Sequence, residues 1–340
     1  MALKLTYEVL ELETAHPFGI ARGTQSAYRA VWVRLTDKDG AEGWGEANPS
    51  SYYGETADTV VAALGRLAPL LADADPFDLE TIESKLWSSI KGNAAARAAV
   101  SAALHDLVGK RLGVPVWKLW GLDPAKAPAS SFTIGIDEPA VIKQKVKEAA
   151  QYLILKVKVG AGNDANILRA VREATDKKIR VDANCGWTAT QAIASLPMLK
   201  EFGVELIEQP LPPDDIEGLA RVRRASDLPI IADESCRTAA DIPRLVGAVD
   251  GINIKLAKCG SLREALRMIA VARAHHMMVM VGCMIETSIG ITAAAHFTPL
   301  LDVVDLDGAA LLKKDPFTGA SIAGGRVTLP TAPGLGVQRR

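Results

Sequence analysis

Short apolar runs alternate with amphipathic stretches from residue 131 onward, and this alternation limits the folds open to the chain. Eight such runs recur at intervals of about 25 residues, a spacing typical of a repeated βα unit. They are SFTIGI, LILKVKV, KIRVDA, VELIEQP, LPIIADE, GINIKLA, MVMVGCM and DVVDLDG. Helix-like stretches such as LREALRMIAVARAHH separate most of them. The pattern predicts a (β/α)₈-type barrel, and a doubly wound parallel sheet is the competing architecture.

The first 125 residues have a different character. Two strand-like runs, RAVWVRL and EGWGEA, flank TDKDG, whose Asp-Gly ending is typical of a hairpin turn. Three helix-like stretches with apolar residues three and four positions apart follow. Strands first and helices after them indicate an α+β unit, and DPAKAPAS separates this unit from the βα repeat.

Composition narrows the class of protein. The chain has 340 residues, 49% of them hydrophobic, and a formal net charge of −1, as expected of a soluble globular protein. We find no run of like charges to attract nucleic acid or an anionic membrane, and no signal peptide or membrane-spanning stretch. The four cysteines stand singly. We therefore expect a cytoplasmic protein that acts on a small molecule, without nucleic acid or membrane partners.

Three carboxylates end three successive apolar runs: Asp182, Glu208 and Asp233. Any one of them could be an ordinary helix N-cap or an ion-pair partner. Parallel strands end on the same side of a barrel, however, so the three side chains converge, and their mutual repulsion calls for a cation. Hard oxygen ligands of this kind suit Mg²⁺. The sequence therefore predicts one Mg²⁺ site per subunit.

Lysines interrupt two of the runs. Lys156 and Lys158 share one face of the second run, because side chains two positions apart on a strand point the same way. Lys255 ends the sixth run, which lies opposite the second in a ring of eight. With Mg²⁺ on a substrate carboxylate, Lys158 or Lys255 can remove an α-proton while the other delivers one to the opposite face. The charge of Lys156 is expected to lower the pKa of Lys158 and favour the neutral base.

The sequence resembles the enolase superfamily, specifically its muconate lactonizing group and the dipeptide epimerases within it. KVK, VDANCGW, IEQP, ADES and INIKLAKCGS carry the resemblance. It implies an α+β capping domain at residues 1–125, a modified (β/α)₇β barrel at 126–318, and a tail at 319–340 that returns to the cap. It also implies catalysis by Lys158 as base and Lys255 as the second lysine, with Mg²⁺. Self-association is common in this family, so we expect a homo-oligomer.

The same resemblance assigns further residues. Asp305 and Asp307 resemble the Asp-x-Asp pair that binds the α-ammonium group of a dipeptide. Glu234 is expected to contact and orient a catalytic lysine, and Glu286 to lie near the substrate. Arg22, in one of two cap loops over the barrel mouth, either meets an anionic side chain such as glutamate or is a solvated loop residue. The implied reaction is epimerisation of a dipeptide at its C-terminal residue, with L-Ala-D/L-Glu as the first candidate.

Other functions remain open. A cycloisomerase or o-succinylbenzoate synthase would use the same metal and lysines, but its substrate has no ammonium group to hold. VGAGNDA follows a strand and precedes a helix, with an aspartate about 20 residues on, as in an NAD-dependent dehydrogenase. A Schiff-base aldolase would use a barrel lysine without a metal. A barrel could also bind a metal and a ligand without turnover.

Overall fold

Eight parallel strands form the larger sheet of the computed structural model, which describes residues 3–340. The strands are β4 (Phe132–Ile134), β5 (Ile154–Lys158), β6 (Lys178–Asp182), β7 (Val204–Glu208), β8 (Ile230–Ala232), β9 (Gly251–Ile254), β10 (Met278–Val281) and β11 (Val303–Val304). They lie side by side in chain order, and a parallel bridge between Ser130 and Val304 joins the two ends of the sheet. The barrel prediction is confirmed. The doubly wound alternative is wrong, because the strand order never reverses.

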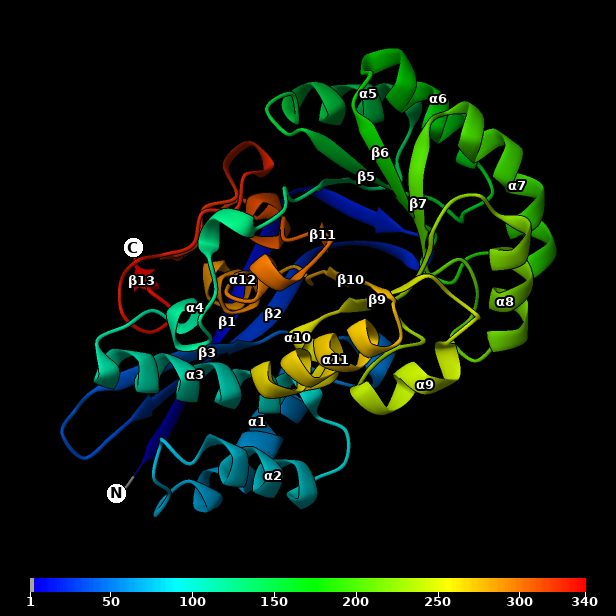
Figure 1. Cartoon of the computed structure of the whole chain (residues 1–340). Coiled ribbons are helices and arrows are strands. Elements are labelled where there is room, and N and C mark those ends of the chain that lie inside the picture. Colours follow the sequence, from blue (N-terminus) through cyan, green and yellow to red (C-terminus); the bar gives the residue numbers. More distant parts are fainter. Residues whose placement is uncertain (1–2) are drawn as a thin grey trace.

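Helices cover the outside of this barrel, as Figure 1 shows for α5 to α8 around β5, β6 and β7. The helices are α5 (Pro139–Glu148), α6 (Asp164–Ala174), α7 (Ala189–Glu201), α8 (Ile216–Ala225), α9 (Ile242–Leu245), α10 (Leu256–Cys259), α11 (Leu262–Ala274) and α12 (Ser288–Ala295). Each of the first seven strands is followed by at least one helix, whereas β11 leads into the short 3-10 helix η6 (Gly308–Leu311). This is the predicted (β/α)₇β arrangement.

An antiparallel sheet and four helices form the N-terminal cap. Its elements are β1 (Lys4–Ile20), β2 (Gly23–Thr36), β3 (Glu42–Ala47), α1 (Ala57–Leu67), α2 (Leu79–Ser89), α3 (Ala94–Leu112) and α4 (Val116–Leu119). The predicted hairpin between β2 and β3 is present, and α3 ends at Gly113, whose φ of 71° suits a glycine. Strand β1 was not among the predicted elements. Its apolar residues change face along the strand: Leu5 and Val9 pack against the core of the cap, whereas Leu10 and Leu12 belong to the core shared with the barrel.

The remaining short elements connect these parts. They are η1 (Ser51–Tyr53), η2 (Ala68–Leu70), η3 (Pro124–Lys126), η4 (Ala239–Asp241), η5 (Thr298–Leu300), β12 (Phe317–Thr318), η7 (Ala323–Gly325) and β13 (Gln338–Arg339). The C-terminal segment runs beside α4 (Figure 1), where Val116 N donates a 2.9 Å hydrogen bond to Gly334 O. The residue boundaries given above for cap, barrel and tail stay a prediction. Within residues 3–340, no helix combines the length and apolar character that crossing a bilayer requires.

The barrel interior is layered, and the layers follow from strand geometry. Leu206, Ile231, Met280 and Val303 form one buried apolar cluster inside the ring. Side chains two positions apart on a strand point to the same face. Glu208, Asp233 and Asp305 each follow a member of this cluster by two residues. The acidic side chains therefore form the next layer toward the carboxyl ends of the strands, where barrel enzymes carry their active sites.

Candidate active site

A cavity of about 520 Å³ lies between the cap and the carboxyl ends of the barrel strands. The cap lines it with the tip of the β1–β2 hairpin, from Phe18 to Gln25, and with the loop from Asn48 to Tyr52. These are the two loops that the sequence predicts over the barrel mouth. The barrel contributes residues from six strands or the segments that follow them, and the charged ones are Lys156, Lys158, Lys255, Asp305 and Asp307.

The carboxylates at the ends of β6 and β7 and directly after β8 are buried, and each of them pairs with at least one lysine. Lys158 Nζ donates a 2.7 Å hydrogen bond to Asp182 Oδ2, and Lys255 Nζ does the same to Asp233 Oδ2. Strand register explains the first pair, because Lys158 and Asp182 are direct partners across β5 and β6. Burial would raise the pKa of Asp182, but the lysine charges outweigh it and hold that pKa below its usual range.

Lys156 lies at the centre of three carboxylates. Its Nζ is 3.1 Å from Asp182, 2.7 Å from Glu208 and 2.8 Å from Asp305. Burial alone would lower the pKa of Lys156, but these charges, that of Asp305 foremost, hold it well above its usual value. The expectation that Lys156 acts chiefly as a like charge beside Lys158 needs revision. Three carboxylates compensate the Lys156 charge, so holding those carboxylates in place is its more direct effect.

The donor set suits a hard divalent cation. Asp182, Glu208 and Asp233 supply carboxylate oxygens from the ends of three adjacent strands. Oxygen atoms are the ligands that Mg²⁺ prefers. Glu208 Oε2 and Asp233 Oδ1 are buried and each lies against an ammonium group, Lys156 Nζ at 2.7 Å and Lys258 Nζ at 2.6 Å. Within residues 3–340, no three acidic, histidine or cysteine side chains are gathered as closely as one coordination sphere demands. Each of the three carboxylates is paired with a lysine, and the chemistry of their oxygens fits the ion.

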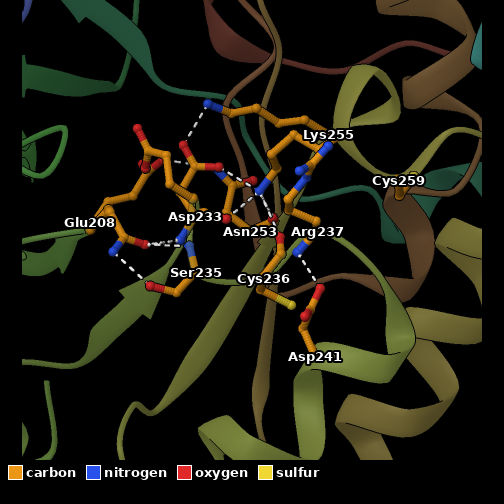
Figure 2. A network of polar contacts seen from close by, with 12 residues as sticks. Glu208, Asp233, Ser235, Cys236, Arg237, Asp241, Asn253, Lys255 and Cys259 are labelled. Carbon is orange, nitrogen blue, oxygen red and sulfur yellow. Dashed lines mark hydrogen bonds and ion pairs between the residues drawn. The ribbon is translucent and has the colours of Figure 1, made fainter. Parts of the chain in front are cut away.

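Asn253 and Gln209 are buried amides that support the segments carrying these carboxylates, and the sequence analysis singled out neither. Asn253 on β9 donates a 2.7 Å hydrogen bond to Glu208 Oε1 (Figure 2). Gln209 Oε1 accepts hydrogen bonds from the main-chain N–H groups of Asp233, at 2.8 Å, and Ser235, at 3.1 Å. Gln209 has a φ of 34°, an uncommon conformation for a residue other than glycine. A polar residue inside an apolar run, as in GINIKLA, is the signal that could have revealed Asn253.

Asp305 and Asp307 both face the cavity, but their surroundings differ. Asp305 is bound by Lys156 and accepts a 2.6 Å hydrogen bond from Ser131 Oγ. Asp307 Oδ2 accepts a 2.6 Å hydrogen bond from Thr133 N, and no lysine pairs with it among the described residues. Burial and the charge of Asp305 raise the pKa of Asp307 to about 6. Asp307 is therefore the acid with more capacity for an additional cation.

Arg22 and Glu234 meet each other across the boundary between cap and barrel. Arg22 Nη1 lies 2.8 Å from both Glu234 Oε1 and Asn184 O, and the guanidinium carbon is 4.3 Å from the centre of the Tyr52 ring. Arg22 is therefore not simply a solvated loop residue. The hydrogen bond of Glu234 comes from Arg22, and its charge also acts on Lys255 nearby, so a role in orienting that lysine stays a prediction.

Glu286 lies beside the cavity rather than in its lining. Cys283, Met284 and Ile285 line the cavity, whereas the Glu286 carboxylate accepts hydrogen bonds from Met284 N, at 2.7 Å, and Asn48 Nδ2, at 3.3 Å. Burial and the nearby charge of Glu46 raise the pKa of Glu286 to about 8. The expectation of a substrate contact is therefore corrected: Glu286 joins the barrel to the cap loop through Asn48.

The glycine-rich segment before α6 is closed by a side chain of its own. Asp164 Oδ1 accepts a 2.8 Å hydrogen bond from Gly160 N, and Asp164 Oδ2 accepts one of 2.8 Å from Trp187 Nε1. A dinucleotide site would instead offer such main-chain donors to a diphosphate. Together with the barrel topology, this arrangement removes the basis for a dehydrogenase.

Two family models together match most of the chain. "Mandelate racemase / muconate lactonizing enzyme, N-terminal domain" matches residues 4–121, and "Enolase C-terminal domain-like" matches residues 141–340. The chain belongs to the mandelate racemase/muconate lactonizing enzyme family. This membership confirms the resemblance carried by the lysine and carboxylate motifs.

Several members of this family are similar to the chain over its whole length. The L-Ala-D/L-Glu epimerase of Bacteroides thetaiotaomicron is 44% identical, over 99% of this chain and 88% of that protein. The L-Ala-D/L-amino acid epimerase of a Maribacter species is 40% identical, over 98% of this chain and 99% of that one. A crystal structure of a dipeptide epimerase from Enterococcus faecalis, complexed with Mg and the dipeptide L-Leu-L-Tyr, has a TM-score of 0.94, 35% identity and full coverage of both chains.

Proposed function

We propose that this chain epimerises dipeptides at the α-carbon of the C-terminal residue, with Lys158 and Lys255 as the acid–base groups and one Mg²⁺ per subunit. One observation carries the proposal: both lysines line the same cavity as the acidic pair Asp305 and Asp307. The two lysines can transfer a proton, and the two aspartates can bind a cationic group of the ligand. The names of the similar family members, which act on dipeptides, agree with this reading.

The substrate carboxylate belongs at the acidic layer of the barrel. Asp182, Glu208 and Asp233 would hold Mg²⁺, whose charge lowers the energy of the enediolate that forms when the α-proton leaves. Lys158 removes that proton from one face, and Lys255 delivers a proton to the other, so the configuration inverts. In the reverse direction the two lysines exchange roles. The cap excludes water while the α-carbon carries the negative charge.

The α-ammonium group belongs at the other end of the cavity. Asp307 has no lysine partner among the described residues, so it accepts the ammonium group, while Asp305 adds charge from beside it. This site favours a dipeptide over the substrate of a cycloisomerase or an o-succinylbenzoate synthase, because those substrates offer no cation. A buried carboxylate pair facing a neutral ligand would be costly.

The cap surrounds the remaining part of the substrate. Arg22 is the cationic residue at the hairpin tip, its side chain is one-third exposed, and it lines the cavity. A carboxylate on the substrate side chain would find a partner there, so we infer L-Ala-D/L-Glu as the first substrate to test. The 44% identical family member that bears this activity in its name supports the choice.

We also propose that the protein is cytoplasmic, forms a homo-oligomer, and has no nucleic acid or membrane partner. The near-zero net charge and the absence of long like-charge runs in the sequence argue against nucleic acid and anionic membrane partners, and the family resemblance suggests self-association. Size-exclusion chromatography with light scattering measures the oligomeric state directly.

The test of the reaction is a mass-spectrometric screen of L,L-dipeptide pools in D₂O with Mg²⁺. Enzyme-dependent gain of one deuterium at the C-terminal α-carbon is the expected result, and the labelled dipeptides identify the preferred side chains. Parallel incubations with EDTA and with Lys158→Ala serve as controls. No incorporation across a broad pool would contradict the dipeptide proposal and favour a cycloisomerase.

A further inference from the structure

The ammonium group of Lys258 is enclosed by the ends of two adjacent barrel strands. Lys258 lies in α10, three residues after Lys255, and its side chain has no exposed surface. Its Nζ donates hydrogen bonds to the main-chain oxygens of Asp233 at 2.5 Å, Cys236 at 2.9 Å and Asn253 at 2.9 Å. The first two oxygens belong to the segment after β8, and the third belongs to β9. One side chain thus joins both strand ends.

The same ammonium group also lies against the Asp233 carboxylate. An ammonium group has three N–H donors, and the three main-chain oxygens use all of them. Asp233 Oδ1 lies 2.6 Å from Lys258 Nζ and supplies the opposite charge. Lys258 therefore holds both the main chain and the carboxylate of Asp233.

We propose that Lys258 is a positioning residue, which holds the metal ligand Asp233 and the proton-transferring Lys255 in one arrangement before the substrate enters. This inference rests on the proposed function, because that function assigns those two roles. The link to Lys255 runs through the backbone: Asn253, whose carbonyl Lys258 binds, precedes Lys255 by two residues. Figure 2 shows Asp233, Asn253 and Lys255 gathered at this point.

Stability alone explains a buried lysine of this kind poorly. A buried ion pair often contributes no more to stability than apolar side chains of the same volume would, because both charges lose their hydration. Fixed geometry is the benefit that remains. The positions of Asp233 and Lys255 are needed to within a fraction of an ångström for metal binding and proton transfer, and partners that orient metal ligands commonly affect affinity strongly.

Two substitutions separate geometry from charge. Lys258→Arg keeps the positive charge opposite Asp233, but a planar guanidinium cannot direct its donors at three oxygens arranged around an ammonium group. Lys258→Met removes the charge as well. Lys177→Met is the matched control, because Lys177 Nζ also donates to two main-chain oxygens, those of Ala149 at 2.9 Å and Ala150 at 2.6 Å. Lys177 precedes β6, at the end of the barrel opposite the cavity.

Two readouts are measured on the folded proteins. Calorimetric titration with MgCl₂, without substrate, gives the Mg²⁺ affinity. Exchange of the α-proton in D₂O is then measured separately from the two epimers of one dipeptide, because each lysine serves one face. We expect Lys258→Arg to weaken Mg²⁺ binding by at least about tenfold and to slow exchange of one epimer more than the other. Lys177→Met should leave both readouts at the wild-type values.

A folded Lys258→Arg variant with Mg²⁺ affinity within about twofold of wild type and equal exchange of both epimers would overturn the positioning role. If neither Lys258 variant folds while Lys177→Met does, Lys258 serves stability alone, and the proposal is overturned as well. A wild-type protein that binds Mg²⁺ but exchanges no dipeptide would instead overturn the proposed function. The Mg²⁺ titrations of the variants would then still decide the role of Lys258.

Discussion

Lys156 Nζ lies 2.8 Å from Asp305 Oδ2, although 149 positions separate the two residues in the chain. The pair reaches from β5 to the segment after β11, past the intervening strand β4. It engages Asp305 within the acidic layer of the barrel. The two acids of the Asp-x-Asp motif therefore have unequal tasks, with Asp307 more available to a ligand.

Asp307→Asn should raise the KM for dipeptides by about 10- to 100-fold, because a hydrogen bond to a charged group contributes about 1.5–3 kcal/mol. The amide keeps an acceptor for Thr133 N, so the fold should persist. Asp305→Asn is the comparison, and we expect it to lower kcat as well, since it removes a partner of Lys156. Steady-state polarimetry measures both constants. An unchanged KM in Asp307→Asn would remove the ammonium site.

Replacing either lysine of the proposed acid–base pair should stop epimerisation. General acid–base catalysis typically contributes about 10²- to 10⁴-fold, so we expect losses of at least that size for Lys158→Ala and Lys255→Ala. Both proteins should still bind Mg²⁺ in a calorimetric titration, since Asp182, Glu208 and Asp233 remain. Full activity in either variant would eliminate the two-base mechanism.

Arg22→Gln tests which substrate side chain the cap selects. We expect kcat/KM for L-Ala-L-Glu to fall by about tenfold relative to that for L-Ala-L-Gln, because only the first loses a charged partner. Tyr52→Phe is the control: it keeps the ring under the Arg22 guanidinium and removes the hydroxyl that lies 3.8 Å from Cys185 Sγ. An equal fall in kcat/KM for both dipeptides in Arg22→Gln would show that Arg22 does not select the side chain of the substrate's C-terminal residue.

Removal of Mg²⁺ with EDTA should abolish activity, and added MgCl₂ should restore it. Because the folded state alone offers the site, Mg²⁺ at about 100 times its Kd should stabilise the fold by about 2.7 kcal/mol. Thermal unfolding with and without MgCl₂ measures the corresponding rise in Tm. Activity that survives EDTA, or borohydride trapping of substrate on a lysine, would favour the Schiff-base aldolase instead.

Two buried histidines should make stability depend on pH. Burial lowers the pKa of His105 and of His296 to about 4, from an ordinary value of 6.5. Between these values the unfolded chain binds protons that the folded chain does not. Each histidine should therefore cost the fold about 1.4 kcal/mol per pH unit as the pH falls through this range, with no such cost above it.

Urea unfolding of the wild type and of His105→Asn between pH 7 and pH 4.5 checks this sign. The asparagine keeps a donor for Ser101 O, which the His105 ring contacts at 2.8 Å, but does not titrate. The variant should lose stability less steeply, because the carboxylates contribute equally to both proteins. Identical slopes would contradict a neutral His105 in the folded state.

Much of the fold could be predicted because the signals are local. An apolar run marks each barrel strand in the sequence. Apolar residues three and four positions apart, followed by a glycine, mark helix α3. The proposed metal and lysine residues could be placed for the same reason, since each ends a run on the common side of the ring. Strand β1 was not predicted because its apolar residues change from one face to the other between Val9 and Leu10, which breaks the period of two.

Contacts between distant residues were not predictable from the sequence. Glu234 was assigned to a lysine, and its pairing with Arg22, 212 positions away, was not predicted because it depends on how the cap docks. Glu286 was placed near the substrate by the resemblance to the family, yet its own side chain turns to Asn48. Asn253 and Lys258 lie in the same motif as Lys255, and the sequence analysis assigned a role only to Lys255.

The cavity is assembled from two parts of the chain with different chemistry. The barrel contributes the lysines and acids, whereas the hairpin tip and the loop up to Tyr52 contribute the wall that faces the rest of the ligand. Substitutions in those two loops can alter ligand preference without touching the groups that move protons. Selection for a different dipeptide substrate would therefore act on a few residues of the cap loops, while the proton-transfer chemistry stays the same.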